Sequence, residues 1–105
     1  MQQMHERNDL VENLSGIGRV FCGGAAIGAA RYSVRVSKTV AVVNGEETDL
    51  MTRIEGRVFG GDFDPRGREG SALTLELADG RRWDCLLKDT GGTLLNTGER
   101  GLYRP

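Results

Sequence analysis

The chain has 105 residues, a formal net charge of −1 and 28% charged residues. This length fits one domain with its own core. The near-zero net charge does not imply long-range attraction to nucleic acid or an anionic membrane, although a local patch can still attract either. Sixteen glycines favour tightly turned β-structure over a helical bundle.

The N-terminal segment is predicted to form one short helix over residues 3–14. A shorter helix capped at Asn8–Asp9 is the alternative. The apolar stripe that supports a helix is partial and consists of Met4, Leu10, Val11 and Leu14. Gly16 fits the position just past a helix end. This polar start lacks the apolar run of a signal peptide, so we expect a cytoplasmic protein without membrane contact.

A first strand is expected from Ile17 to Cys22, and a glycine-rich stretch follows at 23–30. That stretch lacks the lysine and the Ser/Thr of a phosphate-binding loop. We therefore interpret it as a turn or a bulged crossing where small residues let backbones approach.

A long hairpin is predicted from residues 30–43 and 48–59, because apolar and polar side chains alternate on both sides of Asn44-Gly45. A two-residue loop would mix the apolar and polar faces. A three-residue loop, Val43-Asn44-Gly45, keeps them apart. It places Val34 opposite Ile54 and Val36 opposite Thr52.

The segment 60–71 is rich in turn formers and charges, and it is the expected mobile loop. A second hairpin follows, with a three-residue loop at Ala78-Asp79-Gly80. This loop pairs Leu75 with Trp83 and Leu73 with Cys85, so that the apolar side chains share one face. Trp83 is then a core residue.

A short strand at Thr93–Asn96 completes the expected set. The sequence thus predicts a single domain over 1–105, with a helix at 3–14, a β-domain at 16–97 and a tail at 98–105. The fold class is mainly β: a small antiparallel barrel or sandwich of five or six strands with one N-terminal helix. The strand order, and the choice between barrel and sandwich, stay open.

Arginines gather on the non-core face of the long hairpin. The predicted register sets Arg31 opposite Arg57 and Arg35 opposite Arg53, with Glu55 among them. Like charges directly opposite each other are unfavourable unless something bridges them. A phosphate, a nucleic-acid backbone or an acidic partner would do so, and the alternative is a solvated face with Arg–Glu contacts. The candidate binding residues, with two from the loop, are Arg31, Arg35, Arg53, Arg57, Arg66 and Arg68.

Other chemistry-bearing residues form no recognisable motif. The lone His5 lies near the N-terminus, and Cys22 and Cys85 fit small buried residues whose pairing stays open. Asp62-x-Asp64 lacks the further oxygen ligands of a calcium loop. No catalytic, cofactor-binding or metal-ligating residue is predicted.

These observations favour a non-catalytic binding or assembly module, as a homo-oligomer or as a subunit of a larger protein complex. The alternative is a small β-barrel that binds nucleic acid or phosphate through its arginine-rich strand face. A small enzyme ranks third, because no set of acid, base and nucleophile is apparent.

Overall fold

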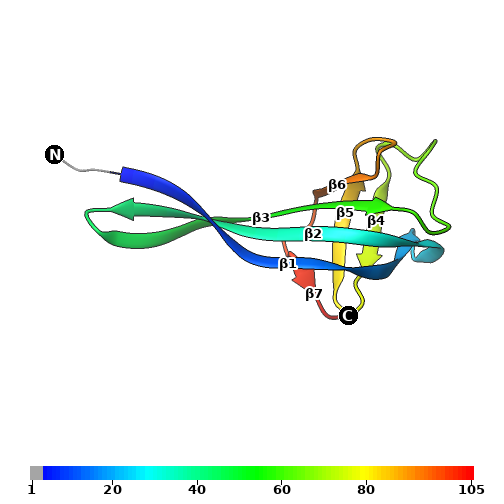
Figure 1. The fold of residues 1–105 in the computed structure, drawn as a ribbon, viewed down its shortest axis with the longest axis horizontal. Coiled ribbons are helices and arrows are strands. Elements are labelled where there is room, and N and C mark those ends of the chain that lie inside the picture. Colours follow the sequence, from blue (N-terminus) through cyan, green and yellow to red (C-terminus); the bar gives the residue numbers. More distant parts are fainter. Residues whose placement is uncertain (1–3) are drawn as a thin grey trace.

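Three long strands dominate the molecule (Figure 1). β1 (Met4–Cys22) and β2 (Ala25–Val43) run antiparallel along their whole length, and β2 continues through a tight turn into β3 (Glu46–Phe59). The computed structural model describes residues 4–105, which extend over 55 × 25 × 21 Å.

One end of this three-stranded sheet curls into a closed barrel. β4 (Ala72–Glu76) pairs with β1 and with β5 (Arg82–Leu87), and β6 (Thr93–Asn96) joins β5 to β3. The six strands β1 to β6 thus close a ring in which every pairing is antiparallel. The short β7 (Leu102–Tyr103) adds to β5 at Arg82 and Trp83. The open choice between barrel and sandwich is therefore settled in favour of the barrel.

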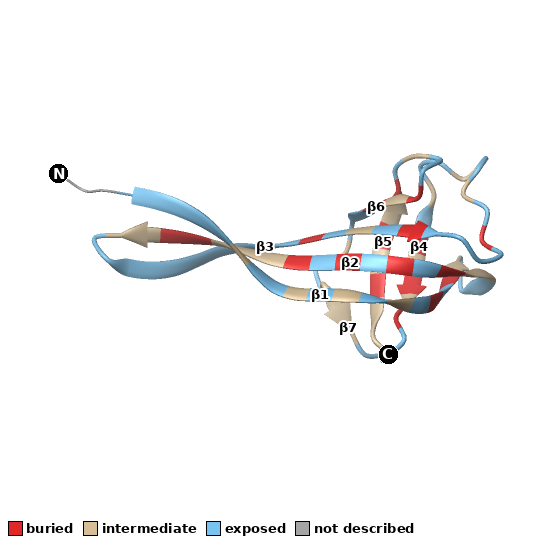
Figure 2. Ribbon diagram, in the orientation of Figure 1, coloured by how far each residue is buried: buried red, intermediate tan, exposed pale blue. Residues whose placement is uncertain are grey.

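The hydrophobic core lies inside the barrel, where buried residues alternate with more exposed ones along the strands (Figure 2). Trp83 is fully buried, as predicted, and its indole Nε1 donates a hydrogen bond to Asn96 Oδ1 at 2.9 Å. Gly56 on β3 leaves room for this indole, because a Cβ there would lie 2.7 Å from Trp83 Cζ3.

The predicted N-terminal helix is wrong. Residues 4–14 belong to β1, residue 3 lies outside the described part, and no helix occurs in residues 4–105. In particular, that part of the chain holds no helix suited to crossing a bilayer. The physical reason is that β2 pairs with β3 along one edge only. Its other edge needs a second strand to satisfy its backbone groups, and β1 supplies one from Met4 to Cys22. This pairing outweighs a weak local helix preference.

From Met51 onward the long hairpin has the predicted faces, but its register there is shifted by two residues. Its loop has two residues, with Asn44 at φ 52° and Gly45 at φ 82°, and Val43 pairs with Glu46. Positive φ at both central residues is the tight turn that matches strand twist. A bulge at Leu50 then adds one residue, so that Val36 lies opposite Ile54.

The second hairpin has the predicted register, with Leu75 opposite Trp83 and Leu73 opposite Cys85. The glycine-rich stretch turns at Gly23–Gly24 and is bulged at Ile27, in line with the turn or bulged crossing expected there. The segment 98–105 is more than a tail, because it contains β7.

Beyond the barrel, the three long strands project as an arm, which we define as residues 4–11 and 37–53 (Figure 1). Within the part of the chain that the structure describes, β1 meets β4 only at Arg19–Phe21 and β3 meets β6 only at Glu55–Arg57. Both outer strands of the arm therefore have open edges. Open edges of this length are ready templates for another strand.

Candidate binding surface

The four hairpin arginines lie on one exposed face of the sheet, as predicted. Strand alternation puts Arg31 and Arg35 of β2 on the side opposite the core, and Arg53 and Arg57 of β3 share that side. We call this outer surface of β1, β2 and β3 the arginine face.

The predicted arginine-on-arginine pairs are not formed. The two-residue shift places Arg35 opposite Glu55, and it places Phe59 opposite Arg31. Glu55 is the only acidic side chain between the arginines along β3. The four arginines and Glu55 leave a local excess of three positive charges.

Two shallow depressions lie on the arginine face. Arg35 and Glu55 line both of them, Arg53 lines the first, of about 310 Å³, and Arg57 lines the second, of about 300 Å³. Within residues 4–105 none of the four arginines forms an ion pair, although the Arg57 Nε donates to the Gly91 carbonyl oxygen at 3.1 Å. Their charge is open to an external anion.

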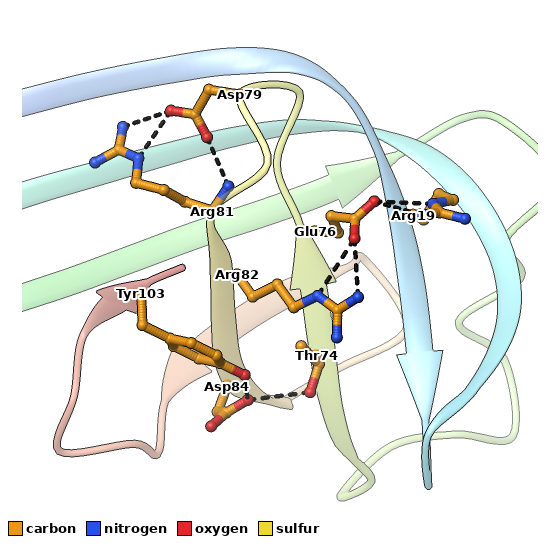
Figure 3. Close-up of polar contacts among 8 residues, drawn as sticks. All are labelled: Arg19, Thr74, Glu76, Asp79, Arg81, Arg82, Asp84 and Tyr103. Carbon is orange, nitrogen blue, oxygen red and sulfur yellow. Dashed lines mark hydrogen bonds and ion pairs between the residues drawn. The ribbon is translucent and has the colours of Figure 1, made fainter. Parts of the chain in front are cut away.

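Several arginines of the barrel are paired with carboxylates of the chain (Figure 3). Across β1, β4 and β5, Glu76 accepts hydrogen bonds from Arg19 at 2.7 Å and Arg82 at 3.1 Å. Arg81 binds both Asp79 and Glu12, which ties the β4–β5 turn to β1. These ion pairs link neighbouring strands of the barrel, whereas Arg31, Arg35, Arg53 and Arg57 form none within residues 4–105.

These internal pairs hold the carboxyl groups in their charged form. The hydrogen bond from Arg19 lowers the pKa of Glu76, and that from Arg82 adds to it against the opposing effect of burial. Burial raises the pKa of Asp84, but hydrogen bonds from Arg100, Tyr103 and Thr74 outweigh it and the net pKa is lowered. These groups stabilise the barrel and have none of the raised pKa values of a general acid.

The two faces of the arm differ in how their charges are satisfied. On the face opposite the arginine face, Arg7 pairs with Asp9 at 2.7 Å and with Glu47 at 3.0 Å. Lys38 pairs with Asp49 at 2.9 Å. Val40, on the same face, is only 2% exposed. The charged side chains named here are thus paired within the chain.

The arginine face of the arm is apolar and exposed in its middle. Leu10 pairs with Ser37 and Met51 pairs with Thr39, so both share the side of Arg35. Leu10 is 58% exposed and Met51 57%. The sequence did not identify this apolar surface, because residues 3–14 were assigned to a helix. The only signal for it in the sequence is that Met51 falls on the same side of the predicted strand as Arg53.

The two loop arginines are not brought to this surface by any described contact. Arg66 binds Asp64 within its own loop at 3.0 Å. Arg68 donates its backbone N–H to the Pro65 carbonyl oxygen. Asp62 also has a structural partner, because its Oδ1 accepts from the Ala29 N–H. The segment 60–71 is thus held by its own polar contacts and by β2.

The remaining candidate groups are scattered. His5 is exposed in the arm, Cys22 is half-buried at the opposite end of β1, and Cys85 lies in the core. Both thiols are free, and burial raises the pKa of Cys85 to about 12. In the described residues no three His, Cys, Asp or Glu side chains converge on a metal site.

A scan against protein-family models finds no match, and searches among curated proteins and among solved structures find no similar protein.

Proposed function

We propose that this chain is a non-catalytic assembly module, which joins copies of itself or a protein partner through the arm. The observation that carries the proposal is the arm itself. It projects from a closed barrel, it has two open strand edges, and it exposes Leu10 and Met51 on the arginine face. In water, one face of a three-stranded sheet is normally covered by other parts of the chain, and its edges are protected. The arm lacks both features, so it is suited to binding a partner.

The barrel supports this role as an anchor. Its core is filled by Trp83 and the inward side chains of six strands. A rigid barrel fixes the roots of the three strands, so the arm presents its side chains in one arrangement. We keep the cytoplasm as the proposed location, since the free thiols of Cys22 and Cys85 fit a reducing compartment.

Binding of nucleic acid or phosphate is the second candidate function. The unpaired charge of Arg31, Arg35, Arg53 and Arg57 favours it, because guanidinium groups bind phosphate in pairs of hydrogen bonds. Against it, Glu55 stands between the arginines, and Phe59 is the only aromatic side chain paired with them. Binders of single strands combine charge with several stacking aromatics.

Light-scattering mass at low and high salt, with absorbance at 260 and 280 nm on the same peak, separates the two functions. Self-assembly predicts a multiple of 11.4 kDa with the absorbance ratio of protein alone. A monomer that carries nucleic acid at low salt and releases it at high salt would refute it and favour the second function.

For that second function, Arg35→Ala and Arg53→Ala are the sharpest variants. Each should weaken binding of a short single-stranded oligonucleotide and make the binding less dependent on salt. Lys88→Ala, outside the arginine face, is the matched control. Equal affinity of wild type and both arginine variants would end the nucleic-acid hypothesis.

A further inference from the structure

The arginine face carries opposite charges at its two ends. The positive end holds Arg31, Arg35, Arg53 and Arg57. At the arm's tip, Glu6 pairs with Ala41 and Glu46 pairs with Val43, which puts both carboxylates on the arginine face. We call Glu6 and Glu46 the acidic tip.

The acidic tip, like the arginines, has no partner of its own. Neither Glu6 nor Glu46 forms an ion pair within residues 4–105, whereas Glu47 and Asp49 on the opposite face are both paired. The arginine face thus has unpaired positive charge toward the barrel, an exposed apolar middle, and unpaired negative charge at the arm's tip, in that order along the strands.

Building on the assembly function above, we propose that two copies of this chain pack arginine face to arginine face, with their arms antiparallel about a two-fold axis. The arginines of each copy then lie over the acidic tip of the other. A parallel arrangement would set arginines on arginines and carboxylates on carboxylates, which is unfavourable. Only the antiparallel arrangement brings opposite charges together at both ends of the interface.

The side chains in the middle of the face suit such packing. The centre of β2 carries only small residues on this side, at Ser37, Thr39 and Ala41, so two sheets can approach closely there. Leu10 and Met51 flank this row on β1 and β3. Two twisted sheets packed face to face at about 10 Å bury such side chains between them. Since the two-fold repeats each contact, the assembly closes at two copies.

The distance between the two ends is compatible with this arrangement. From Arg35 to Val43, the β2 residue paired with Glu46, there are eight strand residues, or about 26 Å. An axis near Ser37 and Thr39 lies close to the midpoint of that span. It therefore brings each acidic tip over the arginine end of the other copy, with the apolar side chains near the axis.

Charge reversal tests the pairing on the full chain. One variant carries Arg35→Glu with Arg53→Glu, and the other carries Glu6→Arg with Glu46→Arg. For each variant alone, the dimer dissociation constant should be at least tenfold higher than that of wild type, because like charges then meet at both ends. An equimolar mixture should recover association, since each reversed end meets its complement. Thermal midpoints equal to that of wild type, measured at concentrations where all are monomeric, control for folding.

Nitroxide labels test the face independently, in a Cys22→Ser background. A label at Met51→Cys should become immobile as protein concentration rises, whereas a label at Thr52→Cys, on the opposite face, should stay mobile. Failure of the mixture to recover association, or equal behaviour of the two labels, overturns the face-to-face dimer.

The outcomes also separate this dimer from the broader assembly role. If wild type is oligomeric and both charge-reversed variants associate equally well, the face-to-face dimer is refuted and assembly through the strand edges remains. A monomer that carries nucleic acid would refute both.

Discussion

Replacement of Gly56 by alanine tests the packing of the barrel core. A Cβ at this position would lie 2.7 Å from Trp83 Cζ3 and 3.1 Å from Cη2. The indole has no space to retreat, because Trp83 is fully buried and its Nε1 is bound to Asn96. Overpacking of this kind costs about 1–3 kcal/mol. Glycine-to-alanine replacement also stabilises the folded protein by about 0.4–1 kcal/mol, because it restricts the conformations of the unfolded chain.

We therefore expect Gly56→Ala to lower the free energy of unfolding by about 1–2 kcal/mol, with each kcal/mol lowering the melting temperature by about 4–8 °C. Urea titration followed by Trp83 fluorescence measures it. Gly98→Ala is the matched control, because its nearest neighbour would be Asp84 Cβ at an ordinary 3.4 Å. It should change stability by less than about 0.5 kcal/mol. If both variants unfold alike, the indole does not pack on β3 at this position.

Two further predictions concern titratable groups. The folded pKa of Glu76 lies below its unfolded value of 4.5, so its contribution to stability is complete above that pH and declines as the pH falls through the folded value. Glu76→Gln should therefore reduce the urea midpoint at pH 6 more than at pH 3, and an equal loss at both would refute the pairing with Arg19. Because burial raises the pKa of Cys85 to about 12, iodoacetamide at pH 8 should modify the half-buried Cys22 in the folded protein and Cys85 only after unfolding. Mass spectrometry of the intact chain reads this out, and two modified thiols in the folded state would contradict it.

Local signals were sufficient where turn chemistry and alternation agreed. At Ala78-Asp79-Gly80 only one loop length keeps the leucines and Trp83 on one face, and the structure has that register. At Asn44-Gly45 the same reasoning gave the correct faces from Met51 onward but the wrong pairing. The error has a physical source, because a two-residue loop combined with the bulge at Leu50 preserves the faces as well as a three-residue loop does. A bulge leaves little trace in composition.

The N-terminal strand could not be predicted from its own residues. Its residues from Met4 to Asn13 show no regular alternation of apolar and polar side chains, because that part of β1 covers no core. What makes it a strand is the unsatisfied edge of β2, a long-range requirement. The same long-range pairing brings Leu10 and Glu6 onto the arginine face. The arginine cluster was therefore predictable from β2 and β3 alone, but the apolar middle and half of the acidic tip were not.

The most direct test of the assembly account is the equilibrium sedimentation mass of wild type, Met51→Asp and Thr52→Asp. Both substitutions add one carboxylate at neighbouring exposed positions of β3, on opposite faces of the arm. The face-to-face dimer predicts twice 11.4 kDa for wild type and Thr52→Asp, and 11.4 kDa for Met51→Asp, with equal thermal midpoints at concentrations where all three are monomeric. Wild type at 11.4 kDa throughout the concentration range, or equal masses for the two variants, would contradict it.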